Sequence, residues 1–215
     1  MKICGLMREE DVKMCVRYGA DIIGFVVEYP RPVPWNLTAE RAKALIRTVE
    51  KPAETCIVTG GSKEKILNLV LEMKPDYVQL HGGESLEDTA WLVGEMKKRG
   101  VKVIKAVFPD TPDLLKAATD FCAAGVDALL LDPRAPGNAK SGGAADLAAY
   151  MELQSAVSCP VILAGGLTPE NAAEAVRETG AQMIDLMTGV ERSYGVKDEK
   201  KVAALFQSLE SGIFD

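Results

Sequence analysis

Residues 17–26, RYGADIIGFV, contain the signal that decides the fold. A glycine closes a helix-like segment, and an unbroken apolar run begins three residues later. Glycine is common just after the last turn of a helix, because it adopts the left-handed conformation without strain. A short strand that is apolar at successive positions is typical of a parallel sheet covered on both faces. This stretch therefore predicts a helix that leads directly into a buried parallel strand.

The same junction recurs along the chain. Each copy follows a helix-like segment, passes through Gly or Pro and enters a run rich in Ile, Val and Leu. The copies are EMKPDYVQLHG at 72–82, KRGVKVIKAV at 98–107, AAGVDALLLD at 123–132 and ETGAQMIDLM at 178–187. The repeating unit is thus one strand plus one helix.

Extending this pattern over the whole chain predicts eight strands and eight helices. The strands are expected near 2–4, 21–27, 54–58, 76–80, 101–107, 127–131, 160–164 and 182–186, and the helices near 8–18, 39–49, 62–73, 85–99, 111–124, 145–157, 168–179 and 198–210. Eight alternating units favour a closed (β/α)8 barrel of the TIM type over an open doubly wound sheet. No change in composition marks a linker, so residues 1–215 are expected to form one barrel domain.

Composition excludes several classes of partner. The 31 acidic and 25 basic residues give a net charge of -6, and the basic residues are scattered, so a nucleic-acid-binding face is not expected. No apolar stretch approaches the roughly 18 residues of a spanning helix, and the start lacks the pattern of a signal peptide. The protein is expected in the cytoplasm, away from membranes.

The five cysteines are Cys4, Cys15, Cys56, Cys122 and Cys159, and no two of them form a C-x-x-C pair. With one histidine in the chain, a structural metal site is not expected. An odd number of widely spaced cysteines also argues against a disulfide framework and for a reducing compartment. Cys15 and Cys122, on predicted helices, are expected to pack in the core.

Residues at the carboxyl ends of the strands are the functional candidates, since barrel enzymes place their sites there. Cys4 follows the first strand, His81 the fourth and Asp132 the sixth. Each has an alternative role: core filling for Cys4, a structural hydrogen bond for His81 and capping of the next loop for Asp132. Lys105 and Asp185 are expected to pair inside the barrel if both face inward.

Two glycine-containing loops suggest the class of ligand. Gly165 and Gly166 follow the seventh strand, while Thr188 and Gly189 follow the eighth. Barrels commonly bind a phosphate with backbone N–H groups of these two loops. A plain tight turn would also explain Gly165 and Gly166. The shared position of both loops favours a small phosphorylated substrate.

Several fragments, in this order and spacing, resemble the phosphoribosylanthranilate isomerases of tryptophan biosynthesis. They are KICGL at 2–6, GADIIGFV at 19–26, VQLHG at 78–82, VIKAV at 103–107, LLLDP at 129–133, SGG at 141–143, ILAGGLTPENA at 162–172, GVE at 189–191 and GVKD at 195–198. The likeness covers nearly the whole chain, and KICG is its most specific fragment.

The resemblance implies a (β/α)8 barrel that uses neither cofactor nor metal. The family converts phosphoribosylanthranilate into a carboxyphenylamino-deoxyribulose phosphate by an Amadori rearrangement. It implies Cys4 as general base, Asp132 as general acid, and Gly165, Gly166, Thr188 and Gly189 as the phosphate-binding backbone. That reaction needs an acid that opens the ribose ring and a base that removes the C2 proton. An aspartate that retains its proton and a cysteine thiolate suit these roles.

One departure concerns the carboxylate of the substrate. Counting back from LTAERA at 37–42, the arginine with which the family binds this carboxylate falls on Trp35. Arg31, four residues earlier, is expected to bind the carboxylate instead while Trp35 packs on the aromatic ring. Arg134, beside Asp132, is an alternative cation, and Arg31 as a solvated loop charge is an alternative reading.

Two other functions remain open. The same barrel is also compatible with an isomerase that acts on another phosphosugar or aminoaldose, because barrels host many chemistries. A non-catalytic protein that binds a phosphorylated metabolite is the third hypothesis, and the presence of both Cys4 and Asp132 counts against it. The resemblance is compatible with a monomer or a homodimer.

Overall fold

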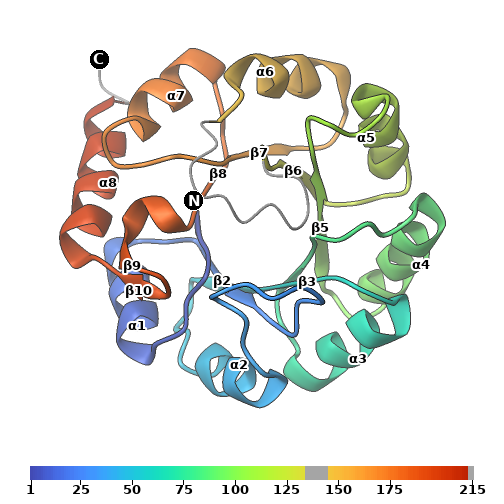
Figure 1. Cartoon of the computed structure of the whole chain (residues 1–215), viewed down its shortest axis with the longest axis horizontal. Coiled ribbons are helices and arrows are strands. Elements are labelled where there is room, and N and C mark those ends of the chain that lie inside the picture. Colours follow the sequence, from blue (N-terminus) through green and yellow to red (C-terminus); the bar gives the residue numbers. More distant parts are fainter. Residues whose placement is uncertain (134–144, 213–215) are drawn as a thin grey trace.

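A closed barrel of eight parallel strands forms the centre of the molecule (Figure 1). The computed structural model describes residues 1–133 and 145–212. Each strand pairs with its neighbours in sequence order, and β1 closes the barrel against β8. The strands are β1 Lys2–Ile3, β2 Ile22–Val26, β3 Glu54–Thr59, β4 Tyr77–Leu80, β5 Lys102–Val107, β6 Ala128–Leu131, β7 Val161–Ala164 and β8 Ile184–Leu186.

In the ranges that the structure describes, eight helices surround the barrel as an outer ring (Figure 1). They are α1 Glu9–Tyr18, α2 Ala39–Ile46, α3 Lys63–Met73, α4 Leu86–Lys97, α5 Leu114–Ala123, α6 Leu147–Ala156, α7 Ala172–Thr179 and α8 Glu199–Gly212. The predicted (β/α)8 architecture is confirmed. The 3-10 helix η1 Thr188–Val190 and the antiparallel strands β9 Glu191–Ser193 and β10 Val196–Lys197 were not expected.

Short local signals fix where each helix begins and ends. The side chains of Thr38, Ser62 and Ser85 accept hydrogen bonds from backbone N–H groups in the first turns of α2, α3 and α4. These bonds satisfy donors that a helix leaves unpaired at its start. Gly19 and Gly180 end α1 and α7 in the left-handed conformation, with φ of 100° and 66°. The chain can then turn directly into the next strand, as the glycine junctions predict.

Burial on both faces of the sheet produces two apolar layers. In β2, Ile23 and Phe25 belong to the large cluster between sheet and helices, whereas Ile22 and Val26 belong to a smaller cluster inside the barrel. The alternation follows from the period of two along a strand. Cys4 belongs to the inner cluster, so its side chain points into the barrel.

This alternation corrects the expected pairing of Lys105 with Asp185. Lys105 points outward from β5, where its Nζ lies 2.9 Å from Glu84 Oε2 and faces the ring of Phe121 on α5. Asp185 instead pairs with Lys2, at 2.9 Å between Nζ and Oδ2. Successive side chains of a strand point alternately into the barrel and out of it, and Lys105 occupies an outward position of β5.

The expectation that the cysteines form no disulfide is wrong for one pair. Cys122, in α5, is bonded to Cys159, which precedes β7, with their Cα atoms 5.6 Å apart. Cys122 is therefore not a free packing residue. The bond closes a loop across 37 positions of sequence. Cys4, Cys15 and Cys56 are free and buried.

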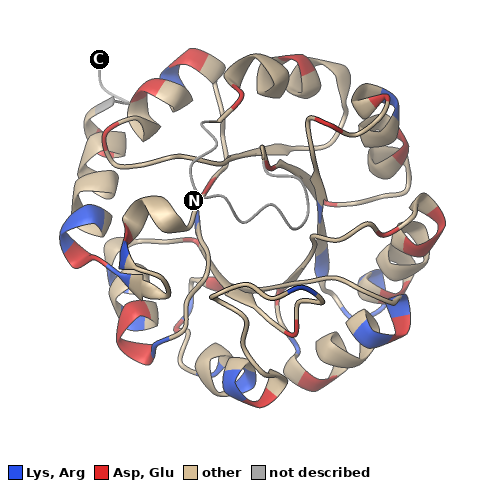
Figure 2. Cartoon of the chain, in the orientation of Figure 1, with Lys and Arg blue, Asp and Glu red and all other residues tan. Residues whose placement is uncertain are grey.

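Charged residues concentrate on the outer helices and on loops, and few lie on the strands (Figure 2). None of the described helices combines the length and the apolar character that a membrane crossing requires. The few charges on the strands are therefore the ones that need a specific explanation.

Candidate active site

Cys4 lies immediately after β1 with its side chain inside the barrel, and the residue is only 4% exposed. Its backbone N–H donates to the carbonyl of Leu186, which extends the ladder between β1 and β8 to the edge of the barrel mouth. On the other side, Gly24 makes room for the thiol. A Cβ atom at position 24 would lie 2.8 Å from Cys4 Sγ, a distance too short for any other residue type.

The surroundings of Cys4 combine burial with two cations. Burial raises the pKa of the Cys4 thiol, and the positive charges of Lys2 and Lys197 act against that rise. The carboxylate of Asp185 reinforces the rise. A thiolate at this position therefore depends on the balance of these three side chains.

Asp132, His81 and Gln79 lie in a row of polar contacts at the mouth. Asp132 follows β6 and is 2% exposed, and its Oδ2 lies 3.3 Å from His81 Nε2. The other ring nitrogen, Nδ1, lies 2.8 Å from the amide nitrogen of Gln79 on β4. In this orientation the amide donates to Nδ1, so a neutral ring carries its hydrogen on Nε2, facing Asp132. The oxygen of the same amide is buried and has no hydrogen-bond partner among the described residues.

Aromatic side chains enclose this row of contacts on two sides. Tyr29 donates its hydroxyl to the carbonyl of His81 at 2.9 Å, and Phe108 presents its ring edge-on to the imidazole with 5.6 Å between centroids. Apolar walls strengthen the electrostatic interactions of the groups between them. His81 is therefore part of the mouth, and the 3.3 Å contact of its Nε2 with Asp132 Oδ2 links it to the predicted acid.

The two glycine loops lie against each other. A Cβ atom on Gly189 would come within 1.9 Å of the carbonyl oxygen of Leu167, so the loop after β8 touches the loop after β7. Gly165 and Gly166 both adopt positive φ, at 92° and 58°. Within the part of the chain that the structure describes, their backbone N–H groups have no acceptor. Asn171, which donates to the Gly166 carbonyl and accepts from the Thr168 N–H, braces the first loop.

Trp35 is part of the inner apolar cluster, with 6% of the residue exposed. Its Nε1 donates to Glu191 Oε1 at 2.9 Å, and Lys197 donates to the same oxygen at 2.9 Å. The ring also meets Tyr194 edge-on. The hairpin of β9 and β10 therefore fixes the indole at the mouth.

Arg31 is exposed on the segment between β2 and α2. Burial raises the pKa of Tyr29, and the Arg31 guanidinium acts in the opposite direction. Arg31 follows Tyr29 by two residues on this segment, and the Tyr29 hydroxyl contacts the carbonyl of His81. The alternative cation, Arg134, and the SGG fragment at 141–143 lie outside the described residues.

Some residues at the mouth carry no signal in the sequence. Gln79 sits in the VQLHG fragment, and its role follows only from the period of two that places it on the same inward face as His81. Lys2 likewise shares the inward face with Cys4. Glu191 and Lys197 contact Trp35 only because of an unpredicted hairpin, so no local pattern could identify them.

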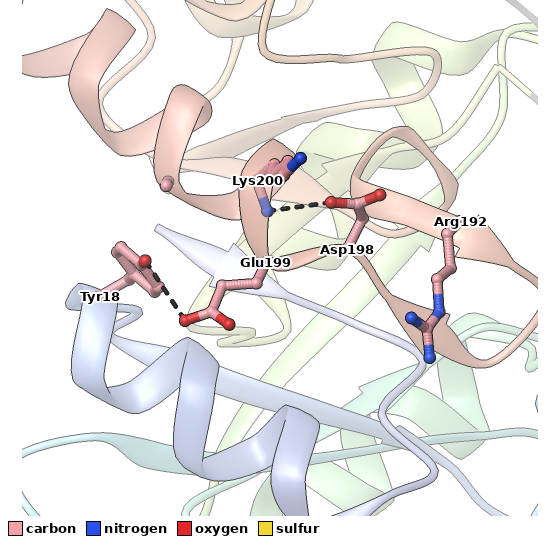
Figure 3. A pocket seen from close by; sticks show the side chains of 6 residues that line it. Tyr18, Arg192, Asp198, Glu199 and Lys200 are labelled. Atoms are coloured by element: carbon pink, nitrogen blue, oxygen red, sulfur yellow. Dashed lines mark hydrogen bonds between the residues drawn. The ribbon is translucent and has the colours of Figure 1, made fainter.

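A separate depression lies outside the barrel, between α1 and the start of α8 (Figure 3). Tyr18, Arg192, Asp198, Glu199 and Lys200 line it, and Tyr18 donates to Glu199 at 3.4 Å. Arg192, Glu199 and Lys200 are exposed, and Glu199 also pairs with Arg17 at 2.6 Å, so the depression is a charged feature of the outer surface. No group of three or more metal-ligating side chains occurs in the described ranges.

A closed eight-stranded barrel with a buried thiol, a carboxyl and an imidazole at the carboxyl ends of its strands defines the class of (β/α)8 barrel enzymes. The comparisons then give the family. The family model for N-(5'-phosphoribosyl)anthranilate isomerase matches residues 1–208, and the chain belongs to this family.

Individual relatives agree with this assignment. The N-(5'-phosphoribosyl)anthranilate isomerase of Haloferax volcanii is 37% identical over 213 residues, covering 98% of this chain and 93% of the relative. A phosphoribosyl anthranilate isomerase crystallised with reduced 1-(o-carboxyphenylamino)-1-deoxyribulose 5-phosphate matches with a TM-score of 0.79 at 26% identity, covering 98% and 97% of the two chains. Monomers generated from the dimeric Thermotoga maritima enzyme match with a TM-score of 0.79 at 27% identity, covering 97% of each.

Proposed function

We propose that this barrel is a phosphoribosylanthranilate isomerase that uses Cys4 as general base and Asp132 as general acid. The observation that carries the proposal is the position of both side chains inside one barrel mouth, at the ends of strands that lie far apart in sequence. Membership of the family, over nearly the full length of the chain, supplies the reaction. The reaction is the Amadori rearrangement of an N-aryl aldosylamine into an aminoketose.

The first step opens the ribose ring. Asp132 gives its proton to the ring oxygen, the bond from that oxygen to C1 breaks, and the nitrogen lone pair forms a C1=N double bond. For this step Asp132 must hold a proton near neutral pH. Asp132 is 2% exposed, and Phe108 packs edge-on against the neighbouring imidazole of His81, so the carboxyl lies in the poorly solvated surroundings that this chemistry requires.

The second step moves a proton from carbon. The Cys4 thiolate takes the C2 proton, the electrons of that C–H bond form C1=C2, and the C1=N electrons return to nitrogen. The resulting enolamine becomes the ketone when C1 gains a proton and the C2 hydroxyl loses one. Cys4 ends as a thiol and Asp132 as a carboxylate, so a proton exchange with water resets both groups.

The glycine loops suit the phosphate of this substrate. Backbone N–H groups that have no acceptor among the described residues, on two loops in contact, can surround an anion without a side chain. We assign Gly165, Gly166, Thr188 and Gly189 to this role. A phosphate there would hold the sugar beside Cys4 and Asp132, which follow the strands β1 and β6 on either side of β7 and β8.

Arg31 is the proposed partner of the anthranilate carboxylate. Because Trp35 is tied to Glu191 beside the inner cluster, its indole is a fixed apolar surface for the substrate ring. Arg31→Ala should lower kcat/KM by roughly tenfold to a hundredfold, the equivalent of losing one charge-assisted hydrogen bond of about 1.5–3 kcal/mol. The measurement compares phosphoribosylanthranilate with the analogue made from aniline.

The analogue that lacks the carboxylate should be affected much less by Arg31→Ala. Arg47→Ala, which removes an exposed arginine just after α2, is the matched control and should leave both substrates unchanged. Equal losses on both substrates, or none on either, would remove Arg31 from the site.

Growth of a tryptophan auxotroph that lacks this isomerase tests the proposed function as a whole. The gene for this chain should restore growth without tryptophan. Soluble, folded protein that fails to restore growth would favour the related barrel isomerase with another phosphosugar as substrate. The buried Trp35 at the position of the family's arginine is the feature that supports this second candidate.

A further inference from the structure

A buried ion pair lies inside the barrel below Cys4. Lys2 and Asp185 are register partners on β1 and β8, and both side chains point inward. Lys2 is 1% exposed, and its Nζ donates to Asp185 Oδ2 at 2.9 Å. The second oxygen, Oδ1, is buried and has no hydrogen-bond partner in the described part of the chain. The Lys2 ammonium therefore pairs with a carboxylate of which only one oxygen accepts a hydrogen bond from the described residues.

Stability does not explain this pair. Transferring two charges into a barrel interior costs several kcal/mol per ion, and apolar residues of similar volume are often as stable or more so. The neighbouring inward residues, Ile22, Ile104 and Ile162, show that this interior accepts branched apolar side chains. A lysine and an aspartate among them call for a role in the chemistry at the mouth.

The ammonium of Lys2 is placed to act on Cys4. The two residues occupy successive inward positions of one chain segment, so their side chains enter the same space. The other charged groups that act on Cys4 are Asp185 and Lys197, and the thiol of Cys56 on β3 also faces Lys2. Lys197 already donates to Glu191 and to the Met187 carbonyl, both at 2.9 Å. Lys2 is thus the cation with capacity to meet a new negative charge.

We propose that Lys2 stabilises the thiolate of Cys4, and that Asp185 holds the ammonium in place while partly offsetting its charge. The proposal rests on the role of Cys4 given above, and both Lys2 and Asp185 are positioning residues. Together they set the fraction of Cys4 that is present as thiolate, which is the form that accepts a proton from the substrate. When Cys4 loses its proton to water, Lys2 gains a second anionic neighbour in addition to Asp185.

The electrostatic balance agrees with this arrangement. Burial, the largest single effect, lowers the pKa of Lys2, but Asp185, Cys4 and Cys56 together outweigh it, and the pKa stands above its usual range. Lys2 is therefore charged throughout the pH range in which the enzyme works. For Cys4 the two partners act with opposite signs: Lys2 lowers the pKa of the thiol and Asp185 raises it. Removing Lys2 should therefore raise the pKa of Cys4, and removing Asp185 should lower it.

This difference in sign provides the test. The rate at which iodoacetamide alkylates Cys4 reports its thiolate fraction, and mass spectrometry of the Cys4 peptide over a pH series measures that rate. Near neutral pH, Lys2→Met should slow alkylation by roughly tenfold or more, since a nearby opposite charge shifts a pKa by about one unit or more. Asp185→Asn should accelerate alkylation several-fold. If the ion pair had a purely structural role, both substitutions would change the alkylation rate of Cys4 in the same direction.

Matched controls separate charge from unfolding. Burial raises the pKa of both Cys15 and Cys56 to about 12, so their peptides should stay unlabelled while the fold is intact. Lys13→Met removes a lysine from the exposed face of α1 and should leave the labelling of Cys4 unchanged. If Lys2→Met does not fold, the double change Lys2→Met with Asp185→Leu leaves no unpaired charge and should still label more slowly than the unaltered protein.

Labelling of Cys4 that is unchanged in both single variants, or changed in the same direction, would overturn the proposal. So would a double variant that labels as fast as the unaltered protein. Because alkylation requires no turnover, these results are independent of the substrate. Labelling rates that shift in opposite directions would support the effect of the ion pair on Cys4 even if Cys4→Ala kept full activity. Full activity of Cys4→Ala would show instead that Cys4 takes no part in the reaction.

Discussion

Replacing Cys4 by alanine is expected to lower kcat by about 10²–10⁴, the usual effect of losing a positioned general base. The thiolate accepts the C2 proton, and alanine has no group that can do so. The change removes one sulfur atom next to Gly24, so the barrel should keep its fold. Steady-state kinetics give kcat, and calorimetry with a reduced product analogue should show that binding is retained.

Cys15→Ala is the matched control for this variant. Cys15 is a free, buried cysteine of α1, outside the barrel interior, so its loss removes the same atom without touching the mouth. Its kcat should stay close to that of the unaltered protein. A Cys4→Ala variant with near-full turnover would show that another group takes the C2 proton.

Asp132→Asn is expected to produce a loss in kcat of similar size, about 10²–10⁴. The amide has the shape of the carboxyl and can keep the contact with His81, but it cannot deliver a proton to the ring oxygen. The variant should therefore bind the product analogue while ring opening becomes rate-limiting. Kinetics on an open-chain Schiff-base analogue should show a much smaller loss, because that compound bypasses the acid step.

Asp127→Asn provides the comparison from the opposite end of the same strand. Asp127 accepts a hydrogen bond from the Val103 N–H at 2.7 Å, and the asparagine oxygen can still accept it. Turnover should be unchanged. Equal losses for the substrate and the open-chain analogue in Asp132→Asn would place the role of Asp132 after ring opening.

Local signals predict most of this fold. Glycine or proline junctions end a helix and start an apolar run, and both features lie within about ten residues of sequence. All eight units follow from them, with strand β5 and helix α3, for example, at their expected places. No sequence pattern predicts the hairpin of β9 and β10, because its strands of three and two residues are too short to show a periodicity.

The site was predictable only in part, for a physical reason. Cys4, His81 and Asp132 are recognisable because a barrel brings all strand ends to one face. Which way a side chain points depends on the phase of each strand, and this decided that Lys2, not Lys105, pairs with Asp185. The contacts of Trp35 with Glu191 join residues 156 positions apart, which no short pattern encodes.

The most direct test of the central claim is ¹³C NMR of ribose-labelled phosphoribosylanthranilate mixed with the purified protein. The anomeric C1 signal should disappear while a C1 methylene and a C2 ketone appear. Cys4→Ala and Asp132→Asn should each slow this change by about 10²–10⁴. Folded protein that leaves the C1 and C2 signals changing only at the spontaneous rate would contradict the claim that this barrel catalyses the rearrangement.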